Sequence, residues 1–305
     1  MLQKMGQKDI SEKVLADYND VFADIVNVLI FHGEEKVKPK DLENALVHSQ
    51  YKAEDGCLHE EERDVCKYWK RRKIAFSIIG LENQTSIDRY MPFRIISYDG
   101  ASYKTQLSKK PKRIVPVVTF VLYFGVDRRW NRQRTIKELL DIPEGLEDYV
   151  NDYKIHVFEI AWLTDKQLKM FKSDFGIVAN FFVQKRKNKD YVPDDKRVIK
   201  HVDEVLKLLS VMSGDRKYER ILFDEKKGKV STMCEVAERL VNKGRTEGML
   251  EGMREGIRKG RHEGETMLAV LINNLLSEGR SEDVALAAKD EEARKRFYKE
   301  FGIID

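Results

Sequence analysis

The stretch that decides the fold is IAFSIIGLENQ, residues 74–84, a nearly continuous apolar run that ends in three polar residues. Consecutive apolar side chains are typical of a strand buried on both faces, as in a sheet that helices cover on each side. A glutamate at the end of such a strand is unusual, because burying a carboxylate is costly unless a cation or hydrogen-bonding partner compensates it. The stretch therefore predicts a central strand whose carboxyl end carries chemistry.

The residues before this stretch predict a helix and the first strand of a hairpin. Apolar residues recur at spacings of three and four between residues 17 and 31, which is the pattern of a helix with one apolar face. Residues 64–69 form a short strand candidate, and the basic residues 70–73 form the turn that joins it to the central strand. Residues 33–60 are polar and charged, and we expect them to form a surface loop.

The residues after the stretch continue an alternation of helix and strand. Ser86 is suited to cap a helix that we expect over residues 87–103, with a kink at Pro92. Two further apolar segments, residues 115–124 and 156–162, predict buried strands. This order of elements predicts an α/β fold with a central mixed sheet flanked by helices, and it does not fit a helical bundle.

Two acidic residues lie at the open end of the predicted hairpin. Asp64 begins its first strand and Glu82 lies at the end of its second, so a tight hairpin brings them side by side. Because side chains alternate along a strand, Glu82 and Gln84 share one face. Two adjacent carboxylates repel, and a hard divalent cation such as Mg²⁺ relieves that repulsion. Such an ion neutralises a phosphate oxygen and lowers the pKa of a bound water, which is the chemistry of phosphodiester hydrolysis.

Each of these residues also has a purely structural interpretation. Asp64 taken alone is more often a solvated residue that begins a strand. Glu82 would be a buried carboxylate paired with Arg89 or Arg94, and Gln84 would cap the helix that follows. The spacing alone leaves both interpretations open.

An acid on one strand followed by Glu-x-polar on the next is the pattern of PD-(D/E)XK nucleases, and the surrounding residues resemble one family of that class. LENQTSIDRYMPFR, residues 81–94, and Tyr98-Asp99 closely resemble the Rpn-type recombination-promoting nuclease or putative transposase family. The resemblance extends to FADIVN at residues 22–27, to Arg63-Asp64, to residues 118–125 and to the glycine-rich tail.

The resemblance implies a restriction-endonuclease-like core, DNA cleavage that depends on Mg²⁺ or Mn²⁺, and site residues at the matching positions. Asp64, Glu82 and Gln84 would be the catalytic residues, with Gln84 where the wider pattern has a lysine. Asp64 and Glu82 would also bind the metal, together with the backbone carbonyl of Asn83. Asp24 matches the acid that this fold often places on its first helix. A glutamine can orient water or donate to a phosphate, but it cannot supply the positive charge of lysine.

The C-terminal tail differs in character from the rest of the chain. Glycines recur every four residues from Gly244 to Gly264 within a charged repeat. Each costs about 1 kcal/mol in a helix relative to alanine, so we expect either a weak helix that a partner stabilises or a flexible connector. Residues 267–304 predict one or two ordinary helices, with Ser281 as a cap. We expect a nuclease-like domain over residues 1–240 and a helical tail over residues 241–305 that mediates self-association.

Composition narrows the class of protein further. The 305 residues carry a formal net charge of +4 and 35% of them are charged, so the placement of charge matters more than its sum. Four basic clusters can line a groove that contacts DNA phosphates, and they lie at residues 70–73, 109–113, 128–134 and 185–189. Three cysteines without ligand spacing, no secretory leader and no apolar run of about 20 residues predict a cytoplasmic protein without membrane contact.

Together these observations predict a Mg²⁺-dependent DNA endonuclease of the recombination-promoting or transposase-like type. The acids of the hairpin, the family resemblance and the basic turns favour this function. The alternative is a catalytically silent DNA-binding or assembly module that keeps the nuclease fold, which Gln84 and the mild net charge favour.

Overall fold

The structure of the chain is a computed structural model with two compact units, Met1–Leu240 and Val241–Asp305, which are described separately. The described residues are 15–45, 48–52, 58–62, 64–71, 74–110, 112–214, 216–222 and 230–304. Arg63 lies outside them, as do one of the three cysteines and parts of the ranges 33–60, 70–73 and 109–113. The assignment of the first part as a nuclease-like domain and of the second as a self-associating tail stays a prediction.

A five-stranded mixed sheet forms the centre of the first unit, with strand order β1-β4-β5-β6-β7. The strands are β1 (Leu42–Asn44), β4 (Val65–Arg71), β5 (Ile74–Gln84), β6 (Val117–Tyr123) and β7 (His156–Glu159). β1, β4 and β5 pair antiparallel, whereas β5, β6 and β7 pair parallel. The apolar stretch of residues 74–84 is the middle strand, which is the place for a strand with two buried faces.

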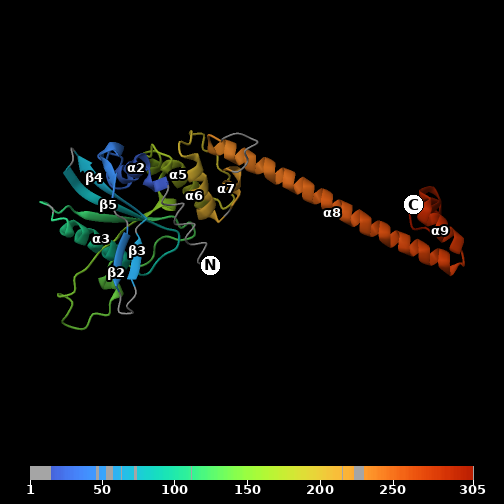
Figure 1. The fold of residues 1–305 in the computed structure, drawn as a ribbon, viewed down its shortest axis with the longest axis horizontal. Helices are drawn as coiled ribbons and strands as arrows, with labels where there is room; N and C mark the ends of the chain where they lie inside the picture. The colour runs from blue at the N-terminus through green and yellow to red at the C-terminus, as the bar shows by residue number, and fades with distance from the viewer. Residues whose placement is uncertain are drawn as a thin grey trace. The chain divides into compact units, whose positions relative to one another are not determined.

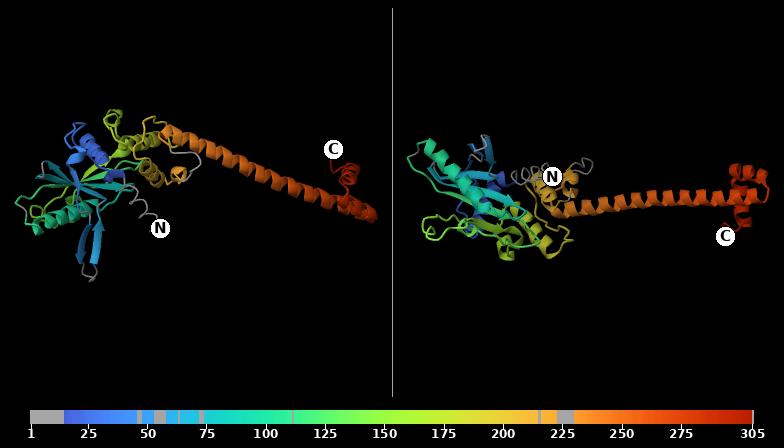
Figure 2. Two further views of the ribbon diagram at one scale, coloured as in Figure 1. Left: turned by 45° about the horizontal axis from the view of Figure 1, so that its top comes forward. Right: turned by 90° about the horizontal axis from the view of Figure 1, so that it is seen from below.

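Helices cover both faces of this sheet (Figure 1 and Figure 2). They are α2 (Asn19–Leu29), α3 (Met91–Ser108), α4 (Asp165–Leu168), α5 (Phe175–Lys187), α6 (Val202–Ser213) and α7 (Lys217–Leu222). α2, α5 and α6 pack in one hydrophobic cluster with Leu81, and α3 packs on the opposite face with Val121. Since side chains alternate along β5, Glu82 and Gln84 lie on the α3 face. The expected α/β fold with a mixed sheet flanked by helices is confirmed.

The segment expected to be a surface loop, residues 33–60, contains strands. β1 lies at the edge of the main sheet and buries one residue, Leu42. β2 (His48–Lys52) and β3 (Leu58–Glu62) pair antiparallel as a separate two-stranded sheet. The loop prediction was wrong because these short strands are polar in sequence. They are held by backbone pairing, and they lack the apolar alternation by which a strand is recognised in a sequence.

Helix α3 begins four residues later than the sequence predicts, at Met91 in place of Ile87. The Asp88 carboxylate accepts the backbone N–H of Tyr90 at 2.8 Å, which holds a turn ahead of the helix. Pro92 therefore lies in the first turn, where its missing N–H has no helical partner to lose. The expected kink at Pro92 has no basis at this position.

The second unit consists of helices, and its boundary falls within α8 (Met233–Ser277), a continuous helix of 45 residues. Of the two forms expected for the glycine repeat, the structure has the helix, with Glu255 and Lys259 paired at 3.2 Å. α9 (Ser281–Lys289) and α10 (Glu291–Glu300) follow, and Asp290 caps α10 through the N–H groups of Glu292 and Ala293. Ser281 is the first residue of α9, so it is not the cap that was expected.

A small hydrophobic cluster joins these last helices, formed by Leu271, Leu275, Ala287, Ala293 and Phe297. Of the helices in the described part of the chain, none has the length and apolar content that a membrane crossing needs.

Candidate active site

The acids of the hairpin lie at the open end of the β4–β5 pair. Val65 pairs with Leu81 at the last step of the antiparallel ladder, so Asp64 lies across from Glu82 at the step that follows. The Oδ2 atom of Asp64 accepts the backbone N–H of Asn83 at 2.6 Å. The hydrogen bond of the Asp64 carboxylate therefore links β4 and β5 one step beyond their last backbone pair.

Glu82 is buried, with 1% of its surface exposed, and it points toward α3. Its Oε1 atom accepts hydrogen bonds from Nη2 of Arg94 at 2.5 Å and from Nε2 of Gln84 at 3.3 Å. Gln84 thus shares the face of Glu82, as the strand period predicts, and its side chain makes no recorded helix cap. The structural alternative for Glu82, a pair with an arginine, is present and uses Arg94, while Arg89 lies over the ring of Tyr90.

Arg94 connects Glu82 to two further side chains of the same region. Its Nη1 atom donates to Asp88 at 3.2 Å and its Nη2 atom donates to the Tyr98 hydroxyl at 3.1 Å. Burial acts to lower the pKa of Arg94, but the charge of Glu82 and the bonds to Tyr98 and Asp88 outweigh it, so the pKa lies above its usual value. Arg94 is therefore a permanent cation beside the Glu82 carboxylate.

The pKa of Tyr98 is also displaced, to about 12. Burial is the main cause, and the nearby charge of Glu82 adds to it, because both disfavour a phenolate. The hydroxyl consequently stays neutral at physiological pH and remains a hydrogen-bonding group.

Asp99, the second residue of the Tyr-Asp pair, has a different environment from its neighbour. It is buried, and its carboxylate accepts hydrogen bonds from the hydroxyl of Thr119 at 2.5 Å and from the hydroxyl of Tyr153. These bonds attach α3 to β6 and to the segment before β7, which fixes the helix that carries Arg94. Spacing along the sequence gives no sign of this role, because both partners lie far from Asp99 in the chain.

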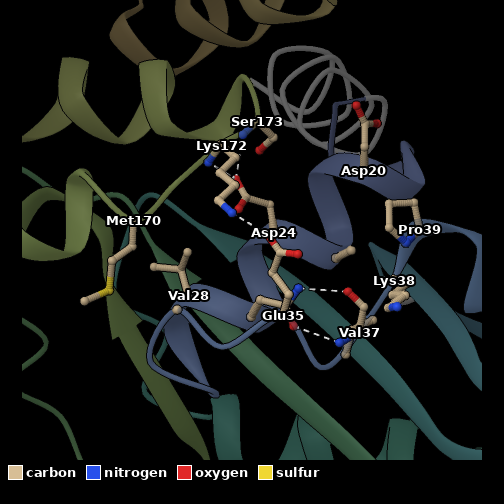
Figure 3. A pocket seen from close by; sticks show the side chains of 13 residues that line it. Asp20, Asp24, Val28, Glu35, Val37, Lys38, Pro39, Met170, Lys172 and Ser173 are labelled. Carbon is tan, nitrogen blue, oxygen red and sulfur yellow. Dashed lines mark hydrogen bonds and ion pairs between the residues drawn. The ribbon is translucent and has the colours of Figure 1, made fainter.

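Asp24 lies in a separate pocket, formed by α2, residues 33–39 and residues 170–173 (Figure 3). Its Oδ2 atom accepts the backbone N–H groups of Lys172 at 2.9 Å and of Ser173 at 2.7 Å, just ahead of α5. Neither Asp64 nor Glu82 lines this pocket. The structure brings Asp64, Glu82, Asn83 and Gln84 together, and it does not bring Asp24 to them.

The donor atoms present at the hairpin end fit a hard divalent cation in kind. Mg²⁺ prefers oxygen ligands, keeps several waters and is commonly bound by one or two carboxylates. Asp64 and Glu82 supply two carboxylates on facing strand positions, and the Asn83 backbone lies beside them. Among the described residues there is no group of three or more acidic, histidine or cysteine side chains suited to a metal. An ion at this place would share Glu82 with Arg94.

A mixed sheet with acids at the end of its central hairpin is the architecture of an α/β nuclease-like core. Residues 69–213 match the family model described as "Putative transposase, YhgA-like", a segment that includes Glu82, Gln84, Arg94 and Asp99. This match confirms the resemblance drawn from residues 81–99, and in coarse terms it supports a transposase-like or nuclease-like role. Comparison with curated proteins and with solved structures gives no match.

Proposed function

We propose that this protein is a Mg²⁺-dependent DNA endonuclease. The observation that supports this most directly is the position of Asp64 across from Glu82 at the end of the central hairpin, in a chain whose residues 69–213 match a putative transposase family. Two facing carboxylates are a common means of holding the ion that phosphodiester hydrolysis uses.

In this proposal Asp64 and Glu82 hold the metal, with the backbone carbonyl of Asn83 as a further ligand. The metal, Mg²⁺ or Mn²⁺, supplies charge neutralisation at the phosphate and a bound water of lowered pKa. Arg94 pairs with Glu82 and orients it in its buried position. Gln84 donates its amide N–H to the attacking water or to a phosphate oxygen, a role that its bond to Glu82 positions it for.

The alternative, a catalytically silent module that keeps this fold and binds DNA, also has an observation in its favour. Arg94 already compensates the charge of Glu82, and Gln84 offers no positive charge for the phosphate. A site of this kind can retain its structure without a metal and without turnover.

Cleavage of supercoiled plasmid distinguishes the two functions. The parent protein, Glu82→Gln and a control, Asp141→Asn, are incubated with Mg²⁺, Mn²⁺, Ca²⁺ or EDTA. Asp141 is exposed and lies outside the site. We expect nicking with Mg²⁺ or Mn²⁺ that Glu82→Gln lowers by about 100-fold or more, as for loss of a central electrostatic group, and that the control retains. Binding of DNA without cleavage by the parent would establish the silent module.

We also propose that the second unit mediates self-association. Apolar side chains along α8 are exposed, among them Met249 at 70% and Met253 at 65%, and exposed apolar patches commonly mark interaction sites. Sedimentation of the full chain carrying Met249→Lys and Met253→Lys is expected to give a lower mass than the parent. An unchanged mass would reject the idea.

A further inference from the structure

The basic clusters of the chain divide into two groups at opposite ends of the main sheet. Lys70 and Arg71 end β4, and a second cluster lies between α3 and β6, so both adjoin the starts of β5 and β6. The cluster at residues 128–134 follows the carboxyl end of β6, and the cluster at residues 185–189 begins in the last turn of α5. β6 has 7 residues, which at about 3.3 Å each separates the two groups by about 20 Å. The clusters therefore do not line one groove, and only the second group shares the strand end that carries Glu82 and Gln84.

A cavity of about 400 Å³ lies at this strand end. Four segments form it: the residues that follow β5, the end of β6 with the residues that follow it, the last turns of α5, and Met212 near the end of α6. Thr85 and Ser86 line it directly after Gln84, the last residue of β5, so the cavity adjoins the proposed active site along the chain. Arg128 and Lys185 supply positive charge from two different segments, and Asp127 is the one acidic residue in the lining.

The two cations of the cavity are available to a ligand. No carboxylate of the described chain lies within ion-pair distance of either: Lys185 is recorded over the ring of Phe181, and Arg128 is engaged through its backbone carbonyl, which accepts the hydroxyl of Tyr123 at 3.1 Å. Arg129 and Arg186 differ, because Arg129 pairs with Glu159 and Arg186 donates to a backbone carbonyl. Two cations with no acidic partner, on different segments of one cavity lining, suit an anion.

The turn that carries Arg128 has a fixed shape. A Cβ atom on Gly125 would lie 2.0 Å from the Tyr123 hydroxyl oxygen, so a glycine is required where the chain leaves β6. The same hydroxyl holds the Arg128 carbonyl, and the ring of Tyr123 packs edge-on against Trp130. The cavity wall is therefore built into the fold and does not depend on a mobile surface side chain alone.

From these observations we propose that the cavity binds a backbone phosphate of the DNA strand, one position removed from the phosphate that is cut. The inference rests on the proposed function, because it takes DNA as the substrate. Arg128 and Lys185 neutralise the phosphate, and the hydroxyl of Ser86 donates to one of its oxygens. Contacts of this kind set the register of a strand without reading its sequence, so the cavity positions the adjacent phosphodiester against Asp64 and Glu82.

The test measures binding of a fluorescent DNA duplex to the full chain in EDTA, at salt concentrations from about 50 to about 200 mM. Over this range phosphate contacts dominate the salt dependence of binding. The double variant Arg128→Ala/Lys185→Ala is compared with Lys109→Ala/Lys112→Ala, which removes the same charge at the other end of the sheet. Both control residues are exposed. Thermal unfolding of each variant verifies that it is folded as the parent is.

We expect the Arg128/Lys185 variant to bind about tenfold more weakly and to lower the slope of log affinity against log salt by about 1, since the loss of one neutralised phosphate removes about 0.9. The Lys109/Lys112 control should change affinity by less than about twofold. Equal losses in both variants would mean that only total charge matters, and no loss in either would leave the cavity without a role; each result overturns the proposal.

Two further comparisons separate the phosphate site from the endonuclease proposal and from a site for free phosphate. If the parent never cuts DNA but the Arg128/Lys185 variant loses binding, the endonuclease proposal fails and the phosphate site stands. If the parent cuts DNA and this variant binds as the parent does, the phosphate site alone fails. Inorganic phosphate is added at constant ionic strength as a competitor. If inorganic phosphate binds the parent through Arg128 and Lys185 and yet leaves its affinity for DNA unchanged, the ligand is a free phosphate and the strand contact is rejected.

Discussion

The hairpin end and the α2 pocket each hold a carboxylate that the sequence marks as a metal ligand, but they hold it by different means. Glu82 is buried and its recorded partners are the side chains of Arg94 and Gln84. Asp24 is partly exposed, and its recorded partners are two backbone N–H groups ahead of α5. Backbone partners are fixed by the fold, whereas side chains can rearrange when a ligand arrives. Glu82 is therefore suited to a functional exchange of partners, and Asp24 is suited to holding a loop.

The largest expected change in stability comes from removing the cation beside Glu82. Arg94→Ala should lower the free energy of unfolding by about 2–3 kcal/mol, because it leaves a buried carboxylate without its cation. The loss is smaller than for a fully buried pair because 38% of the Arg94 side chain is exposed. Urea unfolding measures it, with Arg89→Ala, at an exposed position in the turn ahead of α3, as the control, for which a change of no more than about 0.5 kcal/mol is expected.

A double-variant cycle sharpens this result. In a chain that already carries Glu82→Gln, Arg94→Ala should cost clearly less, because no buried charge then remains to compensate. If Arg94→Ala costs the same amount of unfolding free energy in the parent and in the Glu82→Gln background, Arg94 contributes by packing. The electrostatic account of the hairpin end is then wrong.

The second expected effect is a loss of folding stability at alkaline pH that comes from Tyr98, beside the hairpin end. The pKa of Tyr98 is raised to about 12 in the folded protein, above about 10 in an unfolded chain. A raised pKa contributes stability that is complete below the unfolded value and is lost as the pH rises through the folded value. Stability should therefore fall between about pH 10 and pH 12, and Tyr98→Phe should remove about 2 kcal/mol of that fall. The free energy of unfolding of the parent and of Tyr98→Phe is measured at matched pH values. Parallel curves would contradict the raised pKa of Tyr98.

The parts of the molecule that the sequence predicts are those with a local pattern. The unbroken apolar run of residues 74–84 identifies the central strand, and hairpin geometry then places Asp64 across from Glu82. β1 and the β2–β3 sheet were missed because strands at edges need no apolar alternation. Ser86 has the chemistry of a cap, yet the side chain of Asp88 holds the turn and α3 begins later.

Contacts between distant residues account for the rest of what the sequence did not predict. Asp24 bonds to residues 148 and 149 positions away, and no spacing rule reports a partner at that distance. Asp99 reaches Tyr153 across 54 positions. The sequence predicts either Arg89 or Arg94 as the structural partner of Glu82. Only the packing of α3 against β5 selects Arg94 over Arg89.

The smallest expected effect concerns Asp24 in the α2 pocket. Asp24→Asn keeps an oxygen that accepts the N–H groups of Lys172 and Ser173 and removes only the charge. We expect a loss of about 1 kcal/mol in stability, since hydrogen bonds to a neutral acceptor are weaker than those to a charged one. Because Asp24 does not line the region of Asp64 and Glu82, plasmid cleavage should stay within about twofold of the parent, far from the loss expected for a central electrostatic group.

Measuring unfolding and cleavage on the same preparation makes the outcome decisive. If Asp24→Asn removes cleavage as Glu82→Gln does and leaves stability unchanged, then Asp24 acts at the metal, and α2 must move toward the hairpin when the metal or DNA binds. If both properties change little, the two carboxylates belong to two different functions of the fold. The sequence pattern of an acid on the first helix would then be retained here for the structure of the loop ahead of α5, a role in which the bonded N–H groups of Lys172 and Ser173 are the partners that matter.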